Sequence, residues 1–270
     1  MNADLSDGFG KSTSVSKTTP TSLSRDASSQ ARQGISTIVP AYNEEKALAQ
    51  AVRGLLRTYQ PLGFPFEIII VDDGSTDHTD RVAEQLVGEH SDHVALVRLP
   101  RHLGIGAALQ AGFGQAKCGY VTVCPADVSM DCEDLKPFLM ALGSADVIVG
   151  VRPQRVGYNM LMRLNSWLYV RMVRLFFGLK LRDVNWICFY RRSLLGRIEI
   201  TESGIPMLLE VLAKMRDLGG TFHEVESVQH PREVGVASAS RFRVMWGTAV
   251  GFFRLWWRWR RSRNKYTVGR

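Results

Sequence analysis

The chain has 270 residues, with 34 lysines and arginines, 26 acidic residues and a formal net charge of +8. Hydrophobic residues make up 45%, which is too much for a mostly disordered chain and enough for one sizeable domain or two small ones. The four cysteines form no CxxC pair, so they predict reduced cytosolic thiols and exclude a disulfide scaffold and a zinc site. The longest run free of charged residues, 102–116, contains four glycines, which excludes a polytopic membrane protein. No signal peptide is expected.

The positive charge is concentrated at one end of the chain. Residues 241–270 contain nine basic residues and no acidic one, so residues 1–240 carry 8 − 9 = −1. A near-neutral body with a basic tail predicts a local anionic partner, either a membrane or a nucleic acid.

Residues 1–34 contain twelve serines or threonines and one aromatic residue. They show neither a helical nor a strand period, and we expect a disordered leader without a catalytic role. Strands and helices then alternate. The strands are expected at 35–39, 67–71, 94–99, 120–124 and 146–151, and helices follow the first four at 47–56, 79–86, up to 117 and near 133–142.

The predicted strands are apolar at successive positions, which indicates a parallel sheet covered by helices on both faces. In such sheets, ligands bind at the carboxyl ends of the strands. The second half of the chain predicts helices at 158–179 and 208–218 and a strand at 221–228. Residues 244–261 hold four of the six tryptophans.

The first strand runs into the sequence PAYNEE at 40–45. The simplest interpretation is a corner in which Asn43 caps the following helix and acidic residues occupy its first turn. The second strand ends in VDDGSTD at 71–77. An Asx turn and a helix cap would account for Ser75 or Asp77. They account less well for the adjacent Asp72 and Asp73, which could accept hydrogen bonds from a ribose or a base.

The third strand leads into RHLGIGAA at 101–108. Small residues at the start of a helix let its amides approach a phosphate, although a tight turn with close helix packing would require the same residues. The fourth strand ends in CPADV at 124–128. Asp127 could bind Mg²⁺ or Mn²⁺ that bridges a diphosphate, or it could be a turn residue.

These four loops, in this order, resemble the family-2 glycosyltransferases, and most closely their dolichol-phosphate mannosyltransferase and polyprenyl-phosphate glycosyltransferase branch. The resemblance covers about residues 35–235 and includes the later stretches GVR at 150–152, RDVNW at 182–186 through YRR at 190–192, and HPREVG at 230–235. It implies the GT-A fold, an α/β, Rossmann-like nucleotide-sugar-binding domain.

The resemblance also implies roles for individual residues. Asp127 matches the second acid of the family's DxD metal motif. Asp183 matches an acidic residue near the sugar and the acceptor, and Arg152 matches a basic residue of the catalytic site. Arg152 and Arg163 would meet the lipid phosphate, with Arg232 on a closing loop. The donor-binding positions are Pro40, Tyr42, Glu44, Asp72, Asp73, Gly104, Gly106 and Ala126.

This assignment is chemically sensible. The leaving diphosphate needs neutralisation by a metal or an arginine. A phosphate acceptor is already ionised at pH 7 and scarcely needs a general base, whereas arginines suit its recognition. Arg152 and Arg163 could instead belong to a solvated face. Asp183 could instead form a structural salt bridge with Arg182, Arg191 or Arg192.

Two departures from the family pattern concern the site. Pro125 stands where the first acid of the DxD motif is expected, and only Ser129 or Asp131 could supply a further ligand. Trp186-Ile187-Cys188 replaces the Cys-Gly-Phe or Ser-Gly-Phe of many relatives. Both changes bear on the identity of the sugar and on activity itself.

The tail combines tryptophan, phenylalanine and arginine, which favour the headgroup zone of a bilayer. Nucleic acid is the rival partner because arginine with aromatics suits single strands; the lipid acceptor favours an anionic membrane, bound through 241–265, and no nucleic acid is expected. A third possibility is a helix that packs its tryptophans on the protein's own core. The helix at 158–179 could share the membrane surface and guide the lipid chain.

The sequence thus predicts a leader (1–34), a GT-A domain (35–235) with a mostly parallel sheet, and a basic, amphipathic helical tail (236–270). We expect an inverting hexosyltransferase that moves a sugar from a nucleoside diphosphate sugar to a polyprenyl phosphate, with Mg²⁺ or Mn²⁺, peripherally at the cytoplasmic membrane face. The alternatives are a glycan or lipid hydroxyl acceptor, with Asp183 as base, and a nucleotide-binding pseudoenzyme or scaffold subunit.

Overall fold

The computed structural model describes residues 34–126, 132–153, 160–202, 205–227 and 242–262. The expected leader lies outside these residues, apart from Gly34. The strands are β1 (Ile35–Ala41), β2 (Phe66–Asp72), β3 (Val94–Arg98), β4 (Tyr120–Val123), β5 (Val147–Val151), β6 (Cys188–Arg191) and β7 (Phe222–Glu226). The α-helices are α2 (Leu48–Tyr59), α3 (Thr79–Glu89), α4 (Ile105–Gln115), α5 (Lys136–Met140), α6 (Met160–Phe177), α7 (Arg192–Leu195), α8 (Ile205–Asp217) and α9 (Phe242–Ser262), with 3₁₀ turns η1 (Gln60–Leu62) and η2 (Cys132–Leu135).

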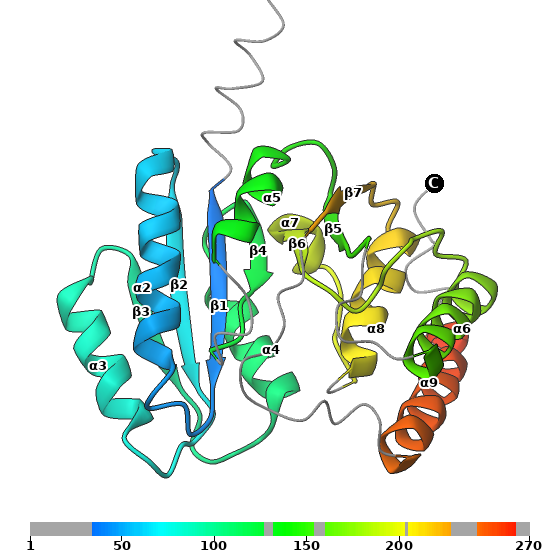
Figure 1. Ribbon diagram of the computed structural model, residues 1–270, viewed down its shortest axis with the longest axis horizontal. Helices are drawn as coiled ribbons and strands as arrows, with labels where there is room; N and C mark the ends of the chain where they lie inside the picture. The colour runs from blue at the N-terminus through cyan, green and yellow to red at the C-terminus, as the bar shows by residue number, and fades with distance from the viewer. Residues whose placement is uncertain (1–33, 127–131, 154–159, 203–204, 228–241, 263–270) are drawn as a thin grey trace, which may run out of the picture.

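The seven described strands form one sheet in the order β3-β2-β1-β4-β6-β5-β7 (Figure 1). The strands β1 to β5 and β7 run parallel, and β6 runs against both of its neighbours. Neither β6 nor α7 was predicted from the sequence. The reversal of β6 matters for function, because it places the loop before β6 at the same edge as the loops that follow the parallel strands.

Two hydrophobic cores cover the two faces of the sheet. Alternate residues of a strand belong to different cores: Ile38 belongs to the core that includes residues of α4, α8 and α9, whereas Ile35 and Val39 belong to the core that includes residues of α2, α3 and α5. This alternation explains why the strand sequences are apolar at every position, and it confirms the predicted layering. Gly112 of α4 allows the close approach of that helix to β1, because a Cβ atom there would lie 2.5 Å from Cγ2 of Ile38.

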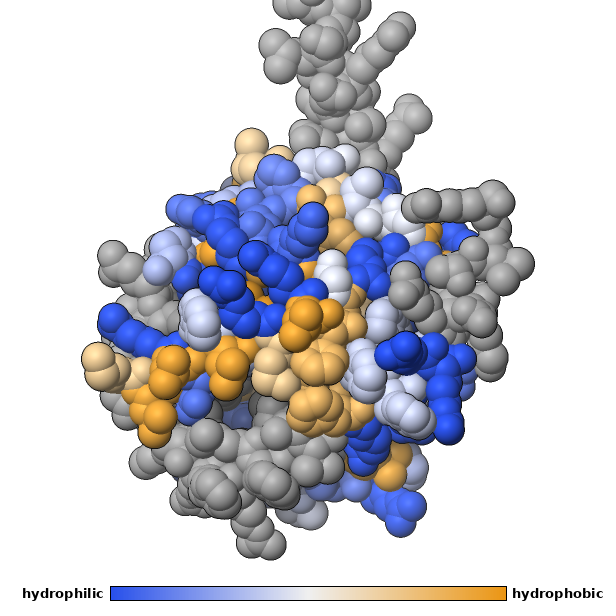
Figure 2. All heavy atoms as spheres, turned by 90° about the vertical axis from the view of Figure 1, so that its right-hand side faces the viewer, coloured by the Kyte–Doolittle hydropathy of each residue, from blue (hydrophilic) through white to orange (hydrophobic). Residues whose placement is uncertain are grey.

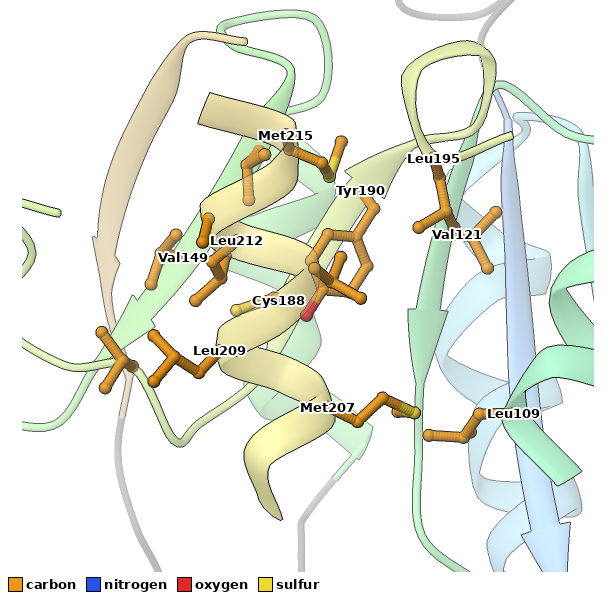
Figure 3. Close-up of a cluster of buried hydrophobic side chains, with 14 of the residues drawn as sticks. Leu109, Val121, Val149, Cys188, Tyr190, Leu195, Met207, Leu209, Leu212 and Met215 are labelled. Carbon is orange, nitrogen blue, oxygen red and sulfur yellow. The ribbon is translucent and has the colours of Figure 1, made fainter. Parts of the chain in front are cut away.

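The half of the sheet around β5 and β6 is covered by α8, whose apolar face points at the strands (Figure 3). Leu209, Leu212 and Met215 of this helix lie over Val149 and Tyr190.

Asp146 precedes β5 and joins it by hydrogen bonds to Arg191 of β6 and to Thr221, which precedes β7. Burial acts to raise the pKa of Asp146, but hydrogen bonds from Thr221 and Arg191 outweigh it and lower the pKa below its ordinary value of 3.8.

The C-terminal helix α9 lies beside α6 and α8 (Figure 1). Its Phe252, Leu255 and Trp259 are buried in the same core as the strands. Trp259 also donates its indole N–H to Asp217 Oδ2 at 2.6 Å. The third possibility weighed for the tail, a helix docked on the protein's own core, therefore holds for one face of α9, and the described tail packs as part of the main domain.

Candidate functional site

The loops that follow β1 and β2 are joined to each other by side-chain hydrogen bonds. Asn43 Oδ1 accepts from the Thr76 amide at 2.8 Å, and the Glu44 amide donates to Thr79 Oγ1 at 2.8 Å. Asn43 has the left-handed backbone angle φ 56°, which asparagine tolerates better than most residues. The expectation that Asn43 caps the next helix is wrong, because α2 begins at Leu48 and Asn43 instead links two loops.

Asp72 is the last residue of β2, and it is 5% exposed. Its Oδ1 accepts from the amide of Ser75 at 3.1 Å and from the Ser75 hydroxyl at 2.5 Å. The Asx-type turn therefore does involve Asp72, contrary to our expectation. None of the described residues donates a hydrogen bond to its Oδ2, which leaves one carboxylate oxygen for a ligand.

Asp73 organises the loop that follows β3. Its two carboxylate oxygens accept from the amides of Leu103 and Gly104, both at 2.8 Å, and Oδ2 lies 2.9 Å from His102 Nδ1. Gly74 lets the two loops meet, since a Cβ atom there would lie 2.3 Å from the carbonyl carbon of Arg101. Asp73 is thus committed to the protein's own backbone. The amide of Gly104, which we expected to face the donor, is held by Asp73.

An aromatic pair lies beside this junction. The rings of Tyr42 and His102 stack with their centroids 3.8 Å apart, and Tyr42 is 39% exposed. Tyr42 was predicted from the sequence as a donor-binding residue, and His102 was given no role. Among the other predicted donor residues, Pro40 and Glu44 are half-buried, and Gly106 and Ala126 are buried. The first three loops thus bring most of the predicted donor residues together.

A second cluster lies at the end of β5. The guanidinium of Arg152 donates to both oxygens of Asp183, from Nε at 2.8 Å and from Nη2 at 3.1 Å, and these side chains are only 7% and 3% exposed. Asp183 Oδ1 also accepts from the amides of Val184 and Asn185. In the structural alternative for Asp183, the expected ion-pair partner was Arg182, Arg191 or Arg192.

That choice of partner was wrong. Arg182 pairs with Glu224 and Glu226, and Arg191 pairs with Asp146. The alternative in which Arg152 belongs to a solvated face was also wrong, because its side chain is almost fully buried. The pairing could not be found from local spacing, since 31 residues separate Arg152 from Asp183.

Cys188 begins β6 close to Asp183. Burial raises the pKa of the Cys188 thiol to about 12, and the charge of Asp183 acts in the same direction. A thiol with such a pKa is un-ionised near neutral pH, so it is unsuited to act as a nucleophile. All four cysteines lie in the described ranges, and no disulfide joins them there.

Several predicted site residues lie outside the described part of the chain. They are Asp127, Ser129, Asp131 and Arg232, with the rest of the stretch 230–235. Arg163 lies exposed near the start of α6, and its meeting with a lipid phosphate stays a prediction. In the described ranges, no group of three or more His, Cys, Asp or Glu residues is arranged to hold a metal ion.

Comparison with known proteins agrees with this architecture. The chain is 28% identical over 209 residues to the dodecaprenyl-phosphate galacturonate synthase of Rhizobium johnstonii, covering 75% of this chain and 61% of that protein. It is also 28% identical to the undecaprenyl-phosphate 4-deoxy-4-formamido-L-arabinose transferase of Pectobacterium atrosepticum, covering 77% of this chain and 63% of that one. The chain thus spans somewhat less than two thirds of each relative.

Among solved structures, glucosyl-3-phosphoglycerate synthase from Mycobacterium tuberculosis, in complex with Mn²⁺, UDP and glucosyl-3-phosphoglycerate, superimposes with a TM-score of 0.64. The match has 17% identity and covers 88% of this chain and 85% of that chain. At this identity the likeness shows the fold, and the expected GT-A architecture is confirmed. Residues 36–201 match the family described as Glycosyl transferase family 2. The chain therefore belongs to glycosyl transferase family 2.

Proposed function

We propose that this protein transfers a sugar from a nucleoside diphosphate sugar to a polyprenyl phosphate, with inversion and without a covalent enzyme intermediate. The observation that carries the proposal is the buried ion pair of Arg152 and Asp183 at the end of β5. The pair fixes a guanidinium, a group suited to phosphate, at the edge where the donor loops also lie. The names of the two curated relatives, both of which refer to polyprenyl phosphates, support the same acceptor.

The state of Asp183 favours a phosphate acceptor over a hydroxyl acceptor. A hydroxyl must lose its proton during transfer, and Asp183 was the candidate base. Both of its oxygens are engaged by Arg152, and Oδ1 accepts two backbone amides as well. A carboxylate that is committed in this way is poorly placed to take a proton, whereas an ionised phosphate needs no base.

The donor would lie along the sheet edge from β2 towards β5. Asp72 Oδ2 would accept from a ribose hydroxyl or a base N–H, and the exposed ring of Tyr42 would pack on the nucleoside. The end of β4 lies between β1 and β6, so the diphosphate would lie there, followed by the sugar near Arg152. Adjacent strands are spaced about 4.8 Å apart, which puts the ends of β2 and β5 roughly 19 Å apart.

A divalent metal at the diphosphate is part of the proposal, since the solved GT-A relative was crystallised with Mn²⁺ and UDP. Its ligand in this chain would be Asp127, and the described residues supply no further cluster. When bound, Mg²⁺ or Mn²⁺ would neutralise the charge of the leaving diphosphate. Arg152 does not depend on the metal for its position, because Asp183 holds it.

We also propose that the protein lies peripherally on the cytoplasmic face of a membrane. The described helices include none with the length and apolarity needed to cross a bilayer. Figure 2 shows hydrophobic and hydrophilic residues side by side on the face that includes α6 and α9, and the exposed charged residues of these two helices are arginines. Their exposed apolar residues are Met160, Leu161, Leu164, Trp167, Leu168 and Leu175 of α6 and Phe253 and Trp257 of α9.

Exposed arginines accompany this apolar surface, and the guanidinium groups of Arg171 and Arg261 lie over the rings of Trp167 and Trp257. Aromatic rings with adjacent arginines suit an anionic headgroup layer. Each basic residue contributes about 1 kcal/mol to such binding, so changing Arg260 and Arg261 to serine should weaken binding to anionic vesicles by about 30-fold.

A matched control removes the same charge elsewhere. Arg57 and Arg81 are exposed on α2 and α3, at the opposite end of the molecule from α9 in Figure 1. Changing both to serine should leave vesicle binding nearly unchanged. Equal losses in the two double variants would show that net charge alone drives binding, and the membrane surface would then be wrongly placed.

The catalytic experiment uses the purified protein, polyprenyl phosphate vesicles and a panel of UDP-, GDP- and dTDP-sugars, with and without Mg²⁺ or Mn²⁺. Release of nucleoside diphosphate and formation of lipid-linked sugar are measured together. Glycolipid formation that requires the metal supports the whole proposal. Glycolipid formation without metal supports the proposed reaction but contradicts the proposed role of the metal. Nucleotide binding without release from any donor would instead support the pseudoenzyme alternative.

A further inference from the structure

Arg152 is fixed in two directions by two different groups. The carboxylate of Asp183 holds the Nε and Nη2 edge of the guanidinium, and the Asn185 carbonyl accepts from Nη2 at 3.3 Å. These bonds lie in the guanidinium plane and leave the group able to tilt about that edge. The guanidinium carbon lies over the ring of Trp186, 4.6 Å from the ring centroid, and a ring this close restricts the movement of the guanidinium on that side.

Trp186 is itself held from two sides. Its indole N–H donates to Ser227 Oγ at 3.1 Å, just beyond the end of β7. On the other side it passes close over Gly150 of β5, where a Cβ atom would lie 2.6 Å from its Cδ1. Because Gly150 has no side chain, the indole can lie in this position. These contacts make Trp186 part of a rigid support for Arg152 rather than a loosely placed surface ring.

The remaining nitrogen of Arg152 is the one left for a ligand. Nη1 donates to no group in the described part of the chain, although the Arg152 side chain is only 7% exposed. A buried guanidinium with one uncommitted N–H₂ group, fixed in direction by Asp183 and in tilt by Trp186, is pre-organised to bind one anionic oxygen.

We propose that Trp186 is a positioning residue for acceptor phosphate binding, which acts by holding the plane of Arg152. This inference rests on the proposed role of Arg152. It also gives a role to the position where tryptophan departs from the pattern of many relatives: the indole adds a cation–π contact to the guanidinium that a smaller residue at 186 would not make.

The test measures binding, so it does not depend on turnover or on the identity of the donor. Calorimetry gives the Kd of a short, water-soluble prenyl phosphate, and the Kd of the nucleoside diphosphate serves as the control for the donor side. The variants are Arg152→Lys, Trp186→Leu, Trp186→Phe, Ser227→Ala and the double variant of Arg152→Lys with Trp186→Leu. A soluble acceptor keeps membrane binding out of the measurement.

Trp186→Leu should raise the Kd of the prenyl phosphate roughly tenfold, as expected for loss of a partly desolvated cation–π contact, and leave the Kd of the nucleoside diphosphate unchanged. Trp186→Phe keeps a ring face and should stay within about threefold of the parent protein. Ser227→Ala should fall between them. The double variant should bind no more weakly than Arg152→Lys alone, because Trp186 acts through Arg152.

Three results would overturn the inference: additive losses in the double variant, equal losses for prenyl phosphate and nucleotide, or no loss in Trp186→Leu. If Trp186→Leu lowers the melting temperature, Trp186→Met replaces it in the same cycle, because the longer and more flexible methionine side chain adapts better to the space left by the ring. Failure of the proposed function has a different signature. In that case the parent protein does not bind prenyl phosphate, or Arg152→Lys binds it unchanged.

Discussion

The carboxylate of Glu202 is a buried charge whose neutralisation depends on α9. Its side chain is 1% exposed, and its two oxygens accept from Arg254 Nη2 at 2.7 Å and from Arg258 Nη1 at 2.9 Å. The two arginines are 60% and 55% exposed, so water solvates them whether or not they are paired. Removing them should therefore cost much more stability than removing Glu202.

The magnitudes follow from this asymmetry. Changing one arginine to methionine keeps most of its aliphatic stem and leaves Glu202 one partner, so the loss should be about 1 kcal/mol, as for a largely exposed ion pair. Changing both leaves a buried carboxylate without a partner, which costs about 3 kcal/mol. In a protein of this size, that loss lowers Tm by roughly 6–12 °C.

The assay is equilibrium unfolding in urea of the double variant Arg254→Met with Arg258→Met, in the parent protein and in a Glu202→Gln background. Glutamine keeps the shape of glutamate without its charge, so the double change should cost less than about 1 kcal/mol in that background. The difference between the two backgrounds is the coupling energy. Equal losses in both would refute the argument, because the arginines would then stabilise α9 through packing and not through Glu202.

Three further predictions concern the loops and the sheet. Gly74→Ala should destabilise the protein strongly, because φ is +66° there and the new Cβ atom would overlap the Arg101 backbone; a fall in Tm of less than about 3 °C would contradict this. Asp72→Asn should keep Tm but raise the donor KM about tenfold or more, since an amide nitrogen cannot accept the hydrogen bond proposed for Oδ2. Because the folded-state pKa of Asp146 is lowered, its stabilisation is present above about pH 4 and is lost as the pH falls through that pKa; in urea titrations, Asp146→Asn should show a smaller loss of stability between about pH 5 and pH 2.5.

Most of the sheet could be predicted from the sequence because its buried strands are continuous apolar runs. The strand β6 could not be predicted in this way, because Cys188–Arg191 has only four residues and ends in a charged residue. It also lies within a stretch that was interpreted as part of the functional site. Helix α9 was predicted as a basic, tryptophan-rich tail, but its periodicity could not show whether one face packs on the protein. In the structure, that face packs into the core, and Phe252, Leu255 and Trp259 are buried.

The predicted site residues separate into two kinds according to what fixes them. Tyr42 and Asp72 follow strands, so the order of the strands places them without further information. Asp183 and Trp186 depend on β6, a strand that reverses direction and was not predicted. Their partner Arg152 is brought to them by the pairing of β5 with β6. The family resemblance therefore pointed to both residues of this pair, but it did not show that they pair with each other.

The reversal of β6 has a consequence for how the reaction could be arranged. Parallel strands alone would deliver only the residues that follow them to the ligand edge. The antiparallel strand β6 lies between β4 and β5 and therefore begins at this edge. The residues that precede β6 in the chain thus reach the ligand edge beside the end of β5. A rigid support for Arg152 is thereby built from two chain segments that enter the edge from opposite directions. In the proposed arrangement, donor contacts and acceptor contacts occupy separate strands, so a variant such as Trp186→Leu should alter acceptor binding while leaving donor binding intact.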